Sequence, residues 1–161
     1  MIREEEKHYL EVLGEDLSLA VGQAIWAFAR IEWLTYEYLK LLSSDRLDML
    51  MGDQSFRART KVIRKLILRS ENTQAQKDQA LDWISQAEKL SEQRNIIVHN
   101  PWQIWVDFDR RDFMSEIQRY EKRDKKLDLA QVRTFTERAQ EVASGLKDSL
   151  NALGSMSNSR G

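Results

Sequence analysis

The chain of 161 residues contains no cysteine, one proline and six glycines. The absence of cysteine excludes disulfide bonds, thiolate metal sites and cysteine nucleophiles, and it is compatible with a reducing cytoplasm. Because proline and glycine are rare, few residues interrupt a helix, and we expect long uninterrupted helices. The two histidines, His8 and His99, are too few for the usual kinds of zinc site. We therefore expect neither a metal nor a cofactor.

Other familiar features are also missing. The glycines do not cluster into a phosphate-binding loop, and no Gly-x-Ser-x-Gly turn is present. No run of about 18 uncharged apolar residues occurs, and the first residues are too acidic for a signal peptide, so we expect a cytoplasmic protein without membrane contact. The 25 basic and 26 acidic residues give a net charge of −1. This balance argues against a globally basic nucleic-acid binder and leaves a local basic surface open.

The residues that are present predict a single helical domain over 1–153, followed by a flexible tail at 154–161. Apolar residues recur at helical spacing over 16–42, 54–69, 74–99 and 129–153, with a short leading helix before residue 16. Asp16 and Asp128 are suitable N-caps for the first and last of these helices. We therefore expect an all-α fold, an antiparallel bundle of four to five helices.

The period changes after Pro101. Trp102, Ile104, Val106 and Phe108 alternate with less apolar positions, as in a strand, and residues 109–112 could turn the chain back into residues 113–120. This pattern predicts a short β-hairpin inserted after the third long helix, with a continuation of helix as the alternative. The charged run over 121–126 favours a solvated loop.

The helix predicted over 16–42 is apolar on more than one side. Its main stripe contains Val21, Ala24, Ile25, Phe28, Ile31, Leu39 and Leu42, whereas Trp26, Ala29 and Trp33 lie on another side. Such a helix is either central to the core or shared between the core and an interface. Glu32 falls inside the main stripe, where a carboxylate either needs a cationic partner or reaches solvent at the edge. Arg94 is the first candidate for that partner.

The stretch from Gln93 to Pro101 ends the third long helix, because proline disfavours helical backbone at the preceding residue. Arg94 falls within the apolar stripe of this helix, and Asn95 and His99 lie on its flank. One interpretation is structural: Arg94 pairs with an acid such as Glu32, and His99 is a helix C-terminal residue favoured by the macrodipole. The other interpretation is chemical.

These three residues suit RNA cleavage by the neighbouring 2′-hydroxyl, which needs no metal. The reaction needs a group that transfers protons near neutral pH, a role that histidine side chains commonly fill, so His99 is the candidate. The planar fork of Arg94 can stabilise charge on the phosphate. Asn95 lies one turn before His99, so it can orient the imidazole or contact a phosphate. One histidine is few for both acid and base, and a two-fold dimer would bring a second copy to a composite site.

At these residues the sequence resembles the HEPN superfamily, all-helical domains whose ribonuclease members carry Arg-x4–6-His with a polar residue after the arginine. Arg94, Asn95 and His99 match this motif with the Arg-x4-His spacing, and the long Trp-rich helix with Glu32 is also similar. The resemblance implies a helical bundle, a homodimer with the motif at its interface, and metal-independent endoribonuclease activity that leaves a 2′,3′-cyclic phosphate. It also implies a toxin–antitoxin or antiviral setting, with an antitoxin protein as a candidate partner. The alternative is a non-catalytic HEPN module that binds a partner or a nucleotide.

A basic face on the helix over 54–69 adds a weaker candidate. Arg57, Lys61, Arg64 and Lys65 lie opposite its apolar face, and residues 54–69 contain no acid. The simple interpretation is a solvated face. The functional interpretation is a surface that contacts RNA phosphates, which basic side chains bind without sequence preference.

Overall fold

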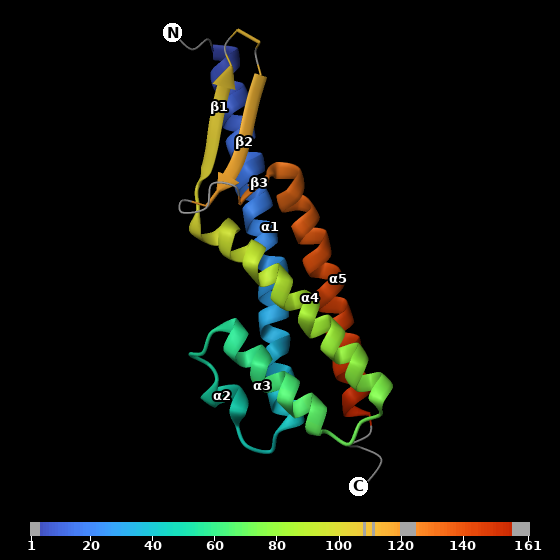
Figure 1. The fold of residues 1–161 in the computed structure, drawn as a ribbon. Coiled ribbons are helices and arrows are strands. Elements are labelled where there is room, and N and C mark those ends of the chain that lie inside the picture. Colours follow the sequence, from blue (N-terminus) through green and yellow to red (C-terminus); the bar gives the residue numbers. More distant parts are fainter. Residues whose placement is uncertain (1–3, 108, 111, 120–124, 156–161) are drawn as a thin grey trace.

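The computed structural model describes residues 4–107, 109–110, 112–119 and 125–155 (Figure 1). Within them the chain forms five helices and one antiparallel sheet of three strands. In chain order the elements are α1 (Glu4–Leu42), α2 (Leu47–Leu50), α3 (Phe56–Arg69), α4 (Gln74–His99), β1 (Trp102–Asp107), β2 (Asp112–Gln118), β3 (Lys126–Asp128) and α5 (Leu129–Gly154). The largely helical class is confirmed, but the fold is not a pure bundle with a hairpin.

α1 is one continuous helix of 39 residues, about 58 Å long at 1.5 Å per residue. The break expected at Asp16 is wrong, because Asp16 lies inside the helix. Gly14 does not end the helix, and its carbonyl accepts a hydrogen bond from the Ser18 hydroxyl at 2.8 Å. The first turns gain support from the sheet, since the rings of Tyr9 and Phe113 lie 4.3 Å apart. This tertiary contact is invisible in the local sequence.

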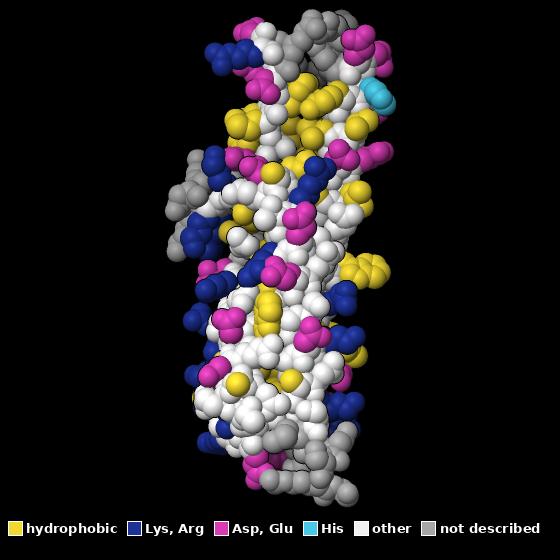
Figure 2. All heavy atoms as spheres, turned by 90° about the vertical axis from the view of Figure 1, so that its right-hand side faces the viewer, with side chains coloured by type: hydrophobic (Ala, Val, Ile, Leu, Met, Phe, Trp, Pro, Cys, Tyr) yellow, Lys and Arg dark blue, Asp and Glu magenta, His cyan; other side chains and the backbone are white. Residues whose placement is uncertain are grey.

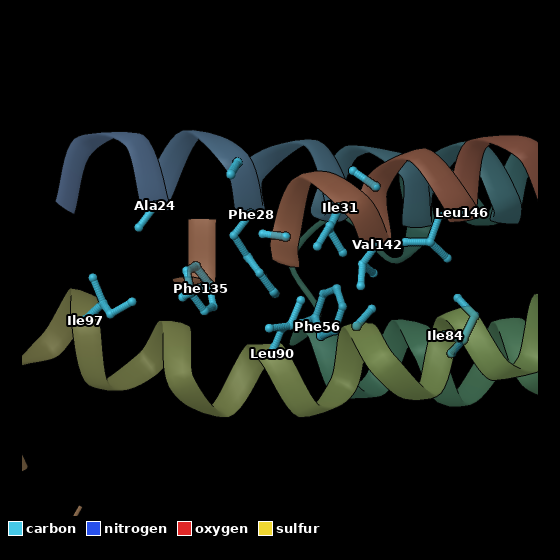
Figure 3. Close-up of a cluster of buried hydrophobic side chains, with 14 of the residues drawn as sticks. Ala24, Phe28, Ile31, Phe56, Ile84, Leu90, Ile97, Phe135, Val142 and Leu146 are labelled. Carbon is cyan, nitrogen blue, oxygen red and sulfur yellow. The ribbon is translucent and has the colours of Figure 1, made fainter. Parts of the chain in front are cut away.

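The hydrophobic core lies between α1, α4 and α5, with α3 closing one side (Figure 3). Phe28 of α1 is central: its ring lies 5.3 Å from Phe56 of α3 and 6.3 Å from Phe135 of α5. The buried face of α5 packs against both α1 and α4.

α1 and α5 run in the same direction, and α4 runs opposite to both (Figure 1). α4 is thus antiparallel to both of its long neighbours, and α1 and α5 are parallel to each other because α4 lies between them in the chain and reverses its direction. A buried polar contact ties the pair together: the Tyr38 hydroxyl donates to the carbonyl of Leu146 at 3.0 Å and hydrogen-bonds with Ser149. Burial raises the pKa of Tyr38 to about 12.

The predicted hairpin is confirmed, with β1 antiparallel to β2 and Trp105 opposite Met114. The loop expected over 121–126 is wrong at Lys126, which begins β3 and pairs with Gln118 of β2. Its ammonium also forms an ion pair with Glu116 at 2.8 Å. Residues 121–124, like Phe108 and Tyr120, lie outside the described residues. Of the tail predicted at 154–161, Gly154 is the last residue of α5, and residues 156–161 lie outside the described residues.

α5 starts at the residue that the sequence indicates. Asp128 accepts a hydrogen bond from the backbone N–H of Gln131, whose side chain accepts from the Asp128 N–H in return. In Figure 2 hydrophobic side chains gather between the sheet and the first part of α1. None of the helices, over the residues described, is long and apolar enough to span a membrane.

Candidate functional site

α4 positions the candidate residues, and both of its ends are well defined. Thr73 caps the start in a reciprocal pair of hydrogen bonds with Gln76. At the other end Asn100 is extended, as expected before Pro101, and its side-chain amide donates to the Ile96 carbonyl at 2.9 Å. That bond satisfies one of the carbonyls that a helix end leaves free. His99 is thereby fixed as the last residue of the helix.

Arg94 turns from α4 towards α1. Its Nη2 donates to Glu32 Oε1 at 2.8 Å, and its guanidinium carbon lies 5.0 Å from the centre of the Phe28 ring. The side chain is 22% exposed, and its buried Nε has no hydrogen-bond partner among the described residues. The ion pair between Arg94 and Glu32, one of the two interpretations open from the sequence, is therefore present.

A second arginine, Arg59 of α3, was missed in the sequence. Its side chain is 6% exposed and donates to Thr35 Oγ1 at 3.1 Å and to the Gln54 carbonyl at 2.6 Å. Its Nη2 lies 3.9 Å from Glu32 Oε1, so Glu32 stands between two arginines. A signal was available: on the helical wheel Arg59 falls between Ile63 and Leu66 on the apolar face, the same conflict that singles out Arg94.

The arginines line a hollow of about 670 Å³ between α1, α3 and α4, which we call the arginine hollow. Its lining includes Glu32, Arg57, Arg59, Arg64, Arg94 and Asn95. Arg64 is held on α4, since it donates to Glu88 at 2.8 Å and to Ser85 at 2.7 Å. Burial alone would raise the pKa of Glu88, but the hydrogen bonds from Arg64 and Thr60 and the charges of Arg64 and Arg57 lower it.

The four basic residues predicted on α3 therefore separate. Arg57 is exposed at the arginine hollow, and Arg64 is engaged with Glu88. Lys61 and Lys65 are exposed and line neither this hollow nor the one beside His99. Only Arg57 combines exposure with a place beside the motif.

His99 lines a second hollow, of about 960 Å³, between the end of α4 and the residues around β2 and β3. We call it the histidine hollow. Its polar lining includes Lys89, Asn95, His99, Arg119, Lys125 and Lys126. Lys89, Glu92 and Asn95 border both hollows, which are thus neighbours along α4. The structure brings Asn95 and His99 to one hollow and places Arg94 in the other.

Comparisons of the chain with protein-family models, with curated proteins and with solved structures found no match.

The histidine hollow combines an imidazole with several cationic side chains. His99 is exposed, and Arg119, Lys125 and Lys126 reach the hollow from the sheet side. Lys126 is engaged with Glu116, whereas Lys89, Arg119 and Lys125 are exposed. Among the described residues no group of three or more His, Asp or Glu side chains is placed to hold a metal ion. This arrangement suits a phosphodiester, which needs charge neutralisation and proton transfer.

Proposed function

We propose that the chain is a metal-independent endoribonuclease of the HEPN type that cleaves RNA in the histidine hollow. The observation that carries this proposal is that His99 shares one hollow with Lys89, Arg119 and Lys125. RNA supplies its own nucleophile, the 2′-hydroxyl, so the protein needs only to move protons and to neutralise the phosphate. The products would be a 2′,3′-cyclic phosphate and a 5′-hydroxyl.

Each residue then has a role. His99 transfers the proton, and Asn95, one turn earlier on the same side of α4, contacts the phosphate or orients the imidazole. Lys89, Arg119 and Lys125 contact the phosphates. Arg94 acts as a positioning residue, because its Nη2 is engaged with Glu32 and its side chain lines the neighbouring hollow. Arg57 of α3, which lines the neighbouring arginine hollow, provides one more cation for the RNA backbone.

A single His99 leaves one of the two proton transfers without a histidine. The composite site predicted from the sequence, in which a second copy contributes its own His99, would supply the missing group and stays a prediction. It can be tested by mixing His99→Ala chains with unmodified chains in varied proportions. Activity that falls with the square of the unmodified fraction, rather than in proportion to it, would require that one site draws on two chains.

The experiment that tests the function uses the purified chain with mixed-sequence single-stranded RNA in excess EDTA. Cleavage with 2′,3′-cyclic phosphate ends is expected, with a loss of about 100-fold or more in His99→Ala, as for removal of a general acid or base. Lys61→Ala, which removes an exposed lysine outside both hollows, is the matched control and should cleave normally. Cleavage that persists in His99→Ala, or no cleavage across varied RNAs, would refute the proposal.

A second candidate function is non-catalytic binding, and the engagement of Arg94 with Glu32 favours it. In a module of this kind the histidine hollow binds a partner, such as an antitoxin protein or a nucleotide, without reaction. Fluorescence anisotropy with labelled RNA separates the two functions. Binding that is unaffected by His99→Ala and is never followed by cleavage would favour the module.

A further inference from the structure

The outer face of α1 carries four apolar side chains at seven-residue spacing. Val12, Leu19, Trp26 and Trp33 are 44%, 60%, 77% and 66% exposed. At 100° per residue they form one line on the side of α1 opposite the buried Phe28. In Figure 2 hydrophobic side chains project from the edge of the molecule that α1 forms. A heptad line with two exposed tryptophans is typical of a helix that packs on another helix.

Gly22 lies on this face, in the middle of α1. A glycine inside a helix costs about 1 kcal/mol relative to alanine. The fold of the chain does not require it, because a Cβ at Gly22 would meet nothing within 4 Å. A glycine on an outer face does allow a second helix to approach closely.

We propose that a second copy of the chain docks antiparallel along this outer face, with the two-fold axis beside Gly22 and Gln23. In this register, two residues of different copies lie opposite each other along the helix axis when their numbers sum to 45. Leu19 then faces Trp26 of the other copy, and Val12 faces Trp33. Both apolar pairs form twice, as a self-complementary two-fold contact requires.

The charged side chains on the same face favour this register. It places Glu15 of one copy opposite Arg30 of the other, and likewise Glu5 opposite Lys40 and His8 opposite Glu37. All six side chains are exposed or half-buried. A parallel copy would place each of these charges opposite itself. An antiparallel register with the axis at Trp26 would oppose Glu15 and Glu37. Like charges in contact disfavour an arrangement, and opposite charges specify it.

The interface is independent of the proposed ribonuclease function. It uses the side of α1 that faces away from Phe28. Because Arg94 of α4 lies over the Phe28 ring, this side also faces away from Arg94 and α4. Each copy would keep its own open histidine hollow. The contact is thus a different one from the composite site expected from the sequence.

The absence of cysteine makes a direct test simple, because any introduced cysteine is the only one in the chain. Gln23→Cys, beside the proposed axis, should form a disulfide-linked dimer under mild oxidation. Lys40→Cys should not link to itself, but should link to Glu5→Cys when the two variants are mixed. Linkage of Lys40→Cys to itself would indicate a parallel pair, and absence of linkage in Gln23→Cys would refute the antiparallel contact.

Sedimentation gives a second, independent readout. The unmodified chain should be a dimer at micromolar concentration, and Trp26→Glu should raise its Kd about 30-fold or more, as for an interface tryptophan. Arg30→Glu should also weaken the dimer, and adding Glu15→Arg should restore it. Circular dichroism will report whether each variant keeps its helices. A monomer throughout, or no rescue by the double exchange, would overturn the proposal.

Discussion

The guanidinium of Arg94 and the imidazole of His99 lie in different hollows, although both side chains come from one helix. Five positions turn the direction of a side chain by about 140° on an α-helix. Arg94 therefore points to Glu32 and the core, and His99 points to solvent. Spacing alone suggested one catalytic set. The structure separates this set into Arg94, which pairs with Glu32, and Asn95 and His99, which line the histidine hollow.

This separation predicts that Arg94 contributes to stability. Arg94→Ala removes a charged hydrogen bond and the contact with Phe28, so the free energy of unfolding should fall by about 2 kcal/mol. Urea unfolding followed by tryptophan fluorescence measures the loss. In a cycle with Glu32→Gln the two losses should not add, because both variants break the same pair. Strictly additive losses would show that the pair is not coupled.

A close contact in α5 gives a second prediction. A Cβ at Gly145 would lie 2.2 Å from the ring of Trp83, a bulky group held against the core. Gly145→Ala should therefore destabilise the chain by about 1–3 kcal/mol. Gly14→Ala is the matched control, since its Cβ would meet nothing within 4 Å, and it should stabilise by about 0.5–1 kcal/mol. Equal effects of the two substitutions would contradict the packing described.

Tyr38 should make stability fall at high pH. Its pKa is raised from 10.0 to about 12 by burial, so the folded state favours the protonated phenol. That contribution is fully present below about pH 10 and is lost as the pH rises towards about 12; its size is of the order of 2–3 kcal/mol. Unfolding curves between these pH values measure it. Tyr38→Phe should lack this part of the decline, and an identical decline in both proteins would refute the assignment.

RNA binding should depend on salt through the histidine hollow. Lys125→Ala and Lys89→Ala should each reduce the slope of log K against log salt by about 0.7, the value for one phosphate contact on a single strand. Fluorescence anisotropy over a salt series gives the slopes. Lys65→Ala, outside both hollows, should leave the slope unchanged. A uniform effect of all three lysines would indicate diffuse attraction rather than a defined site.

Local signals in the sequence predicted the elements that depend on local chemistry. Asp128 at the start of α5 and Pro101 after α4 mark boundaries that the structure keeps, and alternation predicted the β1–β2 hairpin. Glu32 and Arg94 were matched because each is a charge in an apolar stripe, and a buried charge needs a partner.

The features that were missed depend on contacts between distant segments. α1 continues through Asp16 while its first part packs on the sheet, and β3 forms because β2 offers it an edge. Arg59 lies on the apolar face of α3, which is a readable signal, but its partners Thr35 and Glu32 come from α1.

The continuity of α1 has a consequence for how the chain can change. The helix meets the sheet at Tyr9, the ion pair at Glu32 and α5 at Tyr38. One residue inserted between Tyr9 and Phe28 would rotate everything beyond it by 100° relative to the sheet, so these contacts could not all form together. The length of α1 between these contacts is therefore fixed. The helix sets the relative orientation of the sheet, the Arg94–Glu32 ion pair and α5.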